Sequence, residues 1–317
     1  MIRKPTVLIL GAGASHPYGY PLGNGLVTGI VGLTRSGGPP AGGHPGGLHP
    51  VLLREPPYRD QVGDFHERLR LSETSSIDDF LESNADYRDI GRLCIAAHLT
   101  VWGPASNHES HPDRHWYRYL WERMRQGVRT SGEFRENQVR VITYNYDTSL
   151  ERYFAGVLRY TFPDLAASGL EAAKALRDSA LHVVHLHGSL GESADQVFTV
   201  SDRMTLNRLD FYRQVAAGIR IVHDDKPTDE YARAHEWLRA AEVICFLGFG
   251  YHPTNVKRLD VLGQIRGRAG VFYGGTALGL EEAEIERAES LLAIGGPRFL
   301  RRDLDALLYL RRYAPLE

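Results

Sequence analysis

Short runs of β-branched and aliphatic residues, each bounded by glycine or polar residues, recur along the chain and predict β-strands. Apolar and polar residues do not alternate strictly within these runs, so we expect strands that are buried on both faces. The predicted strands are residues 6–10, 139–143, 182–186, 243–247, 271–273 and 306–310.

Helical patterns fall between these runs. Because strands alternate with helices, the sequence predicts an α/β fold with a doubly wound parallel sheet of the Rossmann type. The main predicted helices are residues 148–159, 170–179, 229–240 and 280–293.

The segment between the first two predicted strands is far longer than the roughly 2–6 residues of an ordinary βα connection, so we expect a helical insertion there. A Gly- and Pro-rich loop, residues 35–50, comes first. Ser76, three residues before Asp79, predicts a capped helix, and further helices are expected at residues 91–101 and 115–126.

These features divide the chain into three parts. Residues 1–34 are the first part of a Rossmann-like domain, and residues 35–135 hold the loop and the helical insertion. Residues 136–317 are the remainder of the Rossmann-like domain.

Polar residues directly follow the second predicted strand, in the stretch VITYNYDTSLERYF (residues 141–154). Thr148 and Glu151 have the spacing of a capping box, so Asn145 and Asp147 are expected in the turn before a helix. In open α/β sheets ligands bind at the carboxyl edge of the strands, where helix N-termini and loop amides gather. Asn145 and Asp147 are therefore candidate site residues.

Three other predicted strands end in glycine or polar residues. LILGAGASH places Gly11, Gly13 and Ser15 after the first strand, where a backbone without side chains allows close approach of a phosphate. VVHLHGSL ends the third strand with His187, and VICFLGFGYHPTN ends the fourth with residues 248–250. Because parallel strands share one carboxyl edge, the four motifs predict a single site.

Each motif also has a structural interpretation. The GAGAS turn could be a tight connection, and His187 could be a core histidine bonded to a carbonyl. Asn145 could form an Asx turn, and Asp147 could stabilise a helix N-terminus. Asp78 and Asp79 could approach the site, but they are adequately explained as acidic residues in the first turn of a helix.

Two common nucleotide-binding motifs are missing. A dinucleotide dehydrogenase carries G-x-G-x-x-G, but His16 stands at the third glycine and no acidic residue occurs before Glu55. The P-loop pattern G-x-x-x-x-G-K-[ST] is absent as well. The sequence therefore argues against a hydride-transfer enzyme and against a P-loop nucleotidase.

Composition and spacing exclude further classes. Lys+Arg 37 against Asp+Glu 39 gives a net charge of -2, so no basic field attracts nucleic acid. His108, His111 and His115 lie close together, but Pro112 interrupts the helix that would align them, so no metal site is expected.

The two cysteines, Cys94 and Cys245, lie far apart in the sequence, which fits a reducing compartment and provides no zinc-binding pair. The apolar run at residues 7–10 is too short for a signal sequence, and no run is long enough to span a bilayer. We therefore expect a cytoplasmic protein without membrane insertion.

The ordered set GAGAS, YGYPLG, TYNYD, HG and GFGYHP resembles the NAD-binding core of the sirtuin fold. Together with SIDDFLE and NYDTSLE, it is most similar to the bacterial sirtuin-like family of antiphage defence, whose members cleave NAD. The resemblance extends from about Thr6 to about Thr276 and implies a sirtuin-like Rossmann-type sheet with a helical insertion and no zinc module.

The resemblance implies roles for individual residues. Asn145 would hold the nicotinamide ribose and a water, and His187 would be the general base. NAD would be the substrate, and no metal is implied. The implied cofactor-binding residues are Gly11, Ala12, Gly13, Ala14, Ser15, Tyr20, Pro21, Tyr144, Asn145, Asp147, Gly248, Phe249, Gly250, Gly275 and Thr276.

The chain departs from the deacylating sirtuins in three ways. Two distant cysteines cannot supply their four-cysteine zinc module, Leu22 follows Pro21 where they have a Phe-Arg pair, and Tyr144 stands where they have glutamine. The resemblance therefore implies a hydrolase that converts NAD to nicotinamide and ADP-ribose and depletes NAD during abortive infection. The alternatives are an NAD-dependent protein deacylase and a non-catalytic sensor that binds NAD or ADP-ribose.

Cells cannot tolerate unrestrained loss of NAD, so we expect the activity to be gated. The expected partners are further copies of the chain in a homo-oligomer, or a defence protein such as a translocase-type ATPase. Neither direct nucleic-acid binding nor a membrane is expected.

Overall fold

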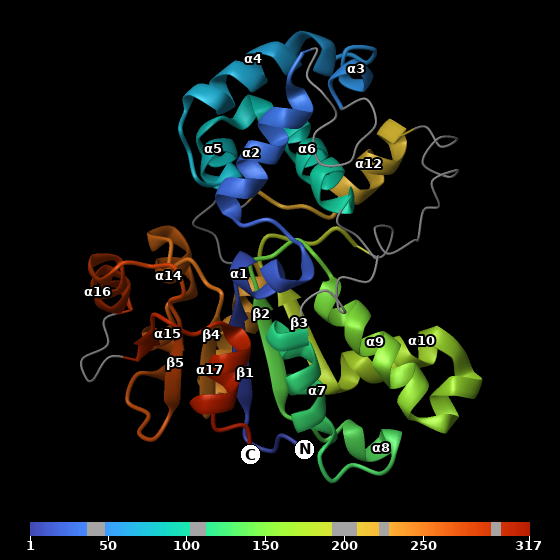
Figure 1. The fold of residues 1–317 in the computed structure, drawn as a ribbon, viewed down its shortest axis with the longest axis vertical. Coiled ribbons are helices and arrows are strands. Elements are labelled where there is room, and N and C mark those ends of the chain that lie inside the picture. Colours follow the sequence, from blue (N-terminus) through green and yellow to red (C-terminus); the bar gives the residue numbers. More distant parts are fainter. Residues whose placement is uncertain (37–47, 102–111, 192–207, 222–227, 293–298) are drawn as a thin grey trace.

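The computed structural model describes residues 1–36, 48–101, 112–191, 208–221, 228–292 and 299–317 (Figure 1). Within these residues, six parallel strands form one sheet in the order β3-β2-β1-β4-β5-β6. This arrangement confirms the predicted α/β fold. The strands are β1 (Thr6–Leu10), β2 (Val139–Thr143), β3 (Leu181–His185), β4 (Val243–Leu247), β5 (Phe272–Thr276) and β6 (Leu300–Arg301).

The central strands are buried on both faces. Every residue of β1 and of β4 is buried, which accounts for the absence of strict alternation in their sequences. Along β1, Leu8 and Leu10 belong to the apolar core on one face, whereas Val7 and Ile9 belong to the core on the other. The sheet is therefore the middle layer of a three-layer sandwich.

Helices cover both faces. The first face is covered by α7 (Trp116–Arg125), α9 (Ser149–Thr161) and α17 (Ala306–Arg312), with α8 (Ser131–Phe134) and α10 (Pro163–Ala180) beside them. The second face is covered by α13 (Asp229–Ala240), α14 (Pro253–Leu259), α15 (Val261–Ile265) and α16 (Glu282–Leu291).

A third group of helices lies above the carboxyl edge of the sheet (Figure 1). We call this group the helical cap. Its members are α2 (Gly23–Thr34), α3 (His49–Leu52), α4 (Tyr58–Leu71), α5 (Ile77–Ser83), α6 (Arg88–Val101) and α12 (Arg208–Ala216). The remaining short elements are α1 (Ala12–Ser15) and the 3₁₀ turns η1 (His16–Tyr18), η3 (Ala85–Tyr87) and η4 (Pro112–Arg114).

The domain boundaries stay a prediction, but packing groups the helices differently from chain order. Helices α2 and α12 come from the two predicted Rossmann segments, yet both pack on α6 in the helical cap. Helix α7 comes from the predicted insertion, yet it packs against α9 and α17 beside the sheet. Most of the predicted loop at residues 35–50 lies outside the described residues.

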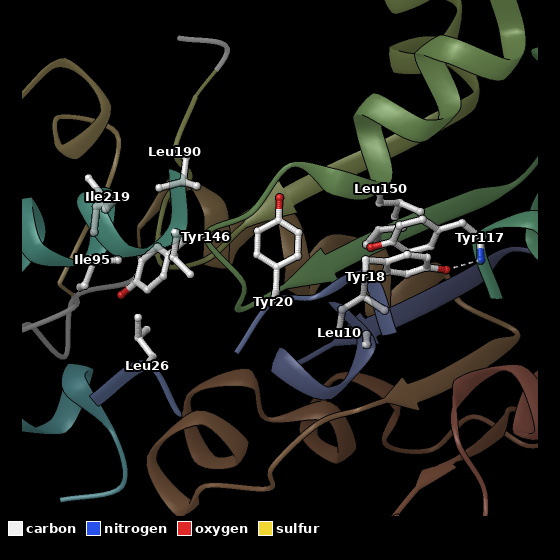
Figure 2. Close-up of a cluster of buried hydrophobic side chains, with 14 of the residues drawn as sticks. Leu10, Tyr18, Tyr20, Leu26, Ile95, Tyr117, Tyr146, Leu150, Leu190 and Ile219 are labelled. Carbon is white, nitrogen blue, oxygen red and sulfur yellow. Dashed lines mark hydrogen bonds between the residues drawn. The ribbon is translucent and has the colours of Figure 1, made fainter. Parts of the chain in front are cut away.

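The apolar core of the first face continues into the helical cap (Figure 2). Tyr18 stacks on Tyr117 with ring centroids 3.8 Å apart, and its hydroxyl accepts a hydrogen bond from the Tyr117 backbone N–H. Further along the same cluster, Tyr146 lies beside Leu26 of α2 and Ile95 of α6. Tyr146, the residue that directly follows Asn145, thus anchors the sheet edge to the helical cap.

The prediction of a strand at residues 306–310 is wrong. This run forms most of α17, because the Asp305 carboxylate caps the helix and accepts a hydrogen bond from the Leu308 backbone N–H at 2.9 Å. A short apolar run fits a buried helix as well as a buried strand, so the pattern alone could not decide. The edge strand is β6, which precedes this helix.

Candidate active site

The register of the sheet brings the predicted motifs together. Leu10 of β1 lies level with Thr143 of β2 and Leu247 of β4, and Thr143 lies level with His185 of β3. All four strands therefore end at the same height, and the turns that follow them meet at one edge.

A cavity of about 170 Å³ opens at this edge. Its walls come from the turns after β1, β2, β3 and β4 and from the helical cap, which contributes Leu26, Asp78 and Leu99. Among the predicted site residues, those that line it are Gly11, Ala12, Ser15, Tyr20, Pro21, Tyr144, Asn145, Asp147, His187, Phe249 and Gly250. Gly13, Ala14, Gly248, Gly275 and Thr276 are not part of its lining.

Gly11, Gly13 and Gly248 pack on one another through their backbones. The Gly13 N–H donates to the Gly248 carbonyl at 3.0 Å, and a Cβ on Gly13 would lie 2.8 Å from the Gly248 Cα. A Cβ on Gly11 would lie 2.6 Å from the Gly248 oxygen, and one on Gly248, whose φ is 56°, would lie 2.1 Å from the Ala14 nitrogen. The close approach that requires these glycines is thus between two turns of the protein.

Gly275 and Thr276 lie behind the turn that follows β4. The Thr276 hydroxyl accepts a hydrogen bond from the Gly248 N–H at 2.8 Å, and the Thr276 carbonyl accepts one from the Tyr251 hydroxyl at 2.8 Å. A Cβ on Gly275 would lie 2.6 Å from the Phe246 Cβ. These residues support the turn that carries Phe249 and Gly250, and their predicted contact with a cofactor stays a prediction.

Asn145 connects the turn after β2 to the turn after β1. Its side-chain Nδ2 donates to the Gly11 carbonyl at 3.0 Å and to the Ser15 hydroxyl at 2.9 Å. Its backbone N–H donates to the Thr143 hydroxyl at 3.0 Å. Among the described residues, no hydrogen bond is formed by its Oδ1, so this oxygen can accept one from a ligand.

The capping box predicted for Thr148 and Glu151 is wrong, although α9 does begin there. The Thr148 side chain forms no capping hydrogen bond; instead the Asp147 carboxylate accepts from the Ser149 backbone N–H at 3.1 Å and from the Ser149 hydroxyl. Glu151 turns away to the neighbouring strand, where its Oε1 lies 2.7 Å from His185 Nε2. Asp147 therefore does what the alternative interpretation proposed, and it also lines the cavity.

The Glu151–His185 contact is a partly buried ion pair. Burial opposes charge on both groups, but the Glu151 carboxylate raises the pKa of His185, and His185 lowers the pKa of Glu151. His185 Nδ1 in turn donates to the Asn145 carbonyl at 2.8 Å. Glu151 and His185 thus hold the backbone of Asn145 in place from the side of β3.

His187 is buried at 6% exposure in the wall of the cavity. Its ring meets the Tyr144 ring edge-on, with centroids 5.2 Å apart, and its backbone carbonyl accepts from the Arg220 N–H at 2.8 Å. Its Nδ1 lies 3.6 Å from Asp78 Oδ1, and its Nε2 is buried without a hydrogen-bond partner among the described residues. An unpartnered buried imidazole nitrogen is costly for a purely structural histidine.

Asp78 lines the cavity, although the sequence interpretation set it aside as a first-turn acidic residue. It begins helix α5, where Ser76 caps the helix as predicted, but it also lines the cavity beside His187. The Tyr146 hydroxyl donates to its carboxylate. The motif SIDDFLE contained the signal, but nothing in the sequence linked it to His187.

Tyr144 and Tyr20 close the sides of the cavity. The Tyr144 hydroxyl donates to the Asn255 carbonyl at 3.0 Å, and burial raises the pKa of Tyr144 well above its usual range. The Tyr20 hydroxyl accepts a hydrogen bond from Arg152 Nη2 at 2.6 Å. Both phenols are thus held by hydrogen bonds in the wall of the cavity.

Comparison with known protein families gives a match to part of the chain. A SIR2-like domain covers residues 139–262. This match implies a sirtuin-related protein that binds or uses NAD, and it includes Asn145, His187 and residues 248–250. Searches of curated proteins and of solved structures found no match.

The described residues contain neither a cluster that could hold a metal nor a helix that could span a membrane. Within them no group of three or more His, Cys, Asp or Glu side chains could hold a metal ion; His108 and His111 lie outside. No described helix is long and apolar enough to cross a membrane.

Proposed function

We propose that the protein cleaves the bond between nicotinamide and ribose in NAD and releases nicotinamide and ADP-ribose. The SIR2-like match supports NAD as the ligand. The observation that carries the proposal is the buried Nε2 of His187, which has no hydrogen-bond partner in the described part of the chain. His187 lies in the wall of a cavity that Asn145 also lines.

The chemistry fits these two side chains. Nicotinamide leaves as a neutral molecule from a pyridinium, so the leaving group needs little help from an acid. The difficulty is the oxocarbenium-like cation left on the ribose. Asn145 Oδ1 can orient a ribose hydroxyl or a water, and His187 can accept the proton that either of them loses.

The size of the cavity indicates which part of NAD it would hold. Its volume of about 170 Å³ is below the roughly 300–1,000 Å³ of a typical ligand site, so we expect it to take the nicotinamide and its ribose. The diphosphate and the adenosine would then extend along the edge of the sheet. Gly11, Gly13 and Ala14 already donate their N–H groups to carbonyls, which leaves Ala12 and Ser15 best placed to face a phosphate.

Water is the expected acceptor of the ribose. An acyl-lysine acceptor would make the protein a deacylase, but Cys94 in α6 and Cys245 in β4 are separate buried thiols that cannot form a four-cysteine zinc module. A sensor that only binds NAD would need no proton acceptor. The unpartnered His187 nitrogen therefore favours catalysis.

We further propose that the activity serves bacterial antiphage defence by depleting NAD when it is triggered. The support for this role is the resemblance of the motifs GAGAS, TYNYD and GFGYHP to that family. Gating by a homo-oligomer or by a translocase-type ATPase belongs to the same proposal.

One experiment tests the function. The purified protein is incubated with NAD, with and without an acylated peptide, and nicotinamide, ADP-ribose, cyclic ADP-ribose and deacylated peptide are quantified. We expect nicotinamide and ADP-ribose without the peptide. Release that depends on the peptide would establish a deacylase, and binding without any product would establish a sensor. A matched pair of variants tests the binding site: Gly250→Leu adds a side chain in open space at the cavity, whereas Gly156→Leu adds one in open space on α9 away from it.

A further inference from the structure

Helix α5 of the helical cap carries three carboxylates that each meet a basic side chain on the sheet side of the molecule. All three pairs connect the cap to the turns and the helix that follow β3 and β4. The pairs are Asp78 Oδ1 to His187 Nδ1 at 3.6 Å, Asp79 Oδ2 to His252 Nε2 at 3.0 Å, and Glu82 Oε1 to Arg258 Nη2 at 2.8 Å.

Asp78 differs from the other two carboxylates in its position. A second cavity of about 80 Å³ lies along α5, and Asp78, Asp79 and Glu82 all line it. Only Asp78 also lines the main cavity, and His187 stands in the wall between the two. Asp78 is therefore the one α5 carboxylate placed to act on the site.

The Asp78 carboxylate is itself fixed and ionised. Tyr146 donates its hydroxyl to Oδ1, and the Tyr146 ring is packed in the core between α2 and α6 (Figure 2). Burial opposes the negative charge, but the neighbouring His187 and the Tyr146 hydroxyl lower the pKa of Asp78 below its usual value. An ionised carboxylate accepts hydrogen bonds and cannot donate one.

This geometry selects one tautomer of His187. A neutral imidazole has one N–H and one lone pair, and the partner of one nitrogen decides which role the other has. The carboxylate faces Nδ1, so the proton is favoured there and the lone pair falls on Nε2, the buried nitrogen without a partner among the described residues. The distance of 3.6 Å is longer than a hydrogen bond, as catalytic contacts often are before a substrate binds.

We propose that Asp78 is a positioning residue, which holds the proton of His187 on Nδ1 and so presents Nε2 as the proton acceptor. When the imidazole takes up a proton, the carboxylate stabilises the resulting positive charge. Because Asp78 belongs to the helical cap, the proton acceptor is completed only with α5 in contact with the sheet edge. The catalytic part of this inference rests on the proposed function.

The test combines spectroscopy with kinetics on the full chain. Protein labelled with ¹⁵N-histidine is studied by NMR at neutral pH without NAD, and the His187 signals are assigned with His187→Gln. We expect Nδ1–H to dominate in the unaltered protein and the Nε2–H form to rise in Asp78→Asn and Asp78→Ala. With NAD, kcat should fall roughly 10- to 100-fold while KM changes little, as expected for a residue that acts through another.

Glu82→Gln is the matched control. It neutralises a carboxylate on the same helix that contacts Arg258 and does not touch His187, so it tests whether docking of α5 alone explains the effect. We expect the His187 tautomer and kcat of this variant to equal those of the unaltered protein. Thermal unfolding of every variant checks that each one is folded.

Two results would overturn the inference: an unchanged tautomer in Asp78→Ala, or an equal loss of kcat in Glu82→Gln. Failure of the proposed function looks different, because the unaltered protein would then release no nicotinamide. The tautomer measurement uses no NAD and decides the role of Asp78 towards His187 independently.

Discussion

The turn after β2 and the turn after β3 supply polar residues to the same cavity, but they hold them in different ways. In the turn after β2, side chains form the connections: Asn145 bonds to Gly11 and Ser15, and Asp147 bonds to Ser149. In the turn after β3, the backbone forms them, through the bond from the Arg220 N–H to the His187 carbonyl.

This difference distinguishes side chains that stabilise the fold from side chains that are available for catalysis. A side chain whose hydrogen bonds are used within the protein contributes to folding, whereas one with an unused polar atom is available to a ligand. Asn145 does both, because its nitrogen is used and its oxygen faces no described partner. His187 is closer to a purely chemical residue, since a backbone bond holds its position and its Nε2 has no partner among the described residues.

The largest effect is expected for His187→Ala. Loss of the proton acceptor should lower turnover by roughly 10²- to 10⁴-fold and leave NAD affinity unchanged. The melting temperature should fall little, because the backbone bond to Arg220 survives the substitution. Nicotinamide release, NAD binding and thermal unfolding measure the three quantities. Full activity in the folded variant would remove the catalytic role of His187.

A smaller effect on the chemistry, combined with a loss of stability, is expected for Asn145→Ala. Two hydrogen bonds between the turns after β1 and β2 are lost, which should cost about 1–3 kcal/mol of the free energy of unfolding. Turnover should fall as well, and the double variant with His187→Ala should lose less than the product of the single losses.

Ser15→Ala is the control for Asn145→Ala, because it removes one of the two acceptors and leaves the Asn145 oxygen in place. It should reproduce part of the loss of stability. Denaturant unfolding measures this. A variant Asn145→Ala that is as stable as the unaltered protein would contradict the distinction between the two turns.

The smallest effect concerns the partly buried pair that connects the two regions, Glu151 and His185. The raised pKa of His185 means that its contribution is complete below its usual pKa and is lost as the pH rises through the raised value. The lowered pKa of Glu151 means that its contribution is complete above its usual pKa and is lost as the pH falls through the lowered value. Both contributions are complete only between about pH 4.3 and 6.5.

The difference in the free energy of unfolding between the unaltered protein and Glu151→Gln should therefore be largest in this window and smaller on either side. Urea unfolding over a pH series measures it. Glu122→Gln, which breaks the exposed pair with Arg118, should give a small difference that does not depend on pH in this way. A difference for Glu151→Gln that is constant from acid to alkaline pH would show that the pair is not charged.

The sequence predicted most of the sheet because strands that are buried on both faces consist of short continuous apolar runs. β1, β2 and β4 begin and end where the apolar runs do. The run at residues 306–310 failed because its identity as a helix depends on the Asp305 cap, a single side-chain bond. The residues that line the cavity were found where they follow a strand, as Asn145 and His187 do.

What the sequence could not supply was contact between distant segments. Asp78 reaches His187 only because the helical cap folds over the carboxyl edge, and no local pattern encodes that. Glu151 had the right spacing for a capping box, but its carboxylate contacts His185 on β3 instead. In both cases the acidic residue meets a histidine from a distant segment, which its local sequence pattern does not encode.

The mutual contact of Gly11, Gly13 and Gly248 has a consequence for protein engineering. The turns after β1 and β4 meet with no side chain between them, at distances where an added Cβ would lie 2.6, 2.8 and 2.1 Å from the nearest atom of the other turn. Neither turn can be replaced alone by a loop from another scaffold unless that loop also has glycine at the matching position. A graft of this site must therefore transfer both turns as one piece, and a library that randomises either one should keep all three glycines constant.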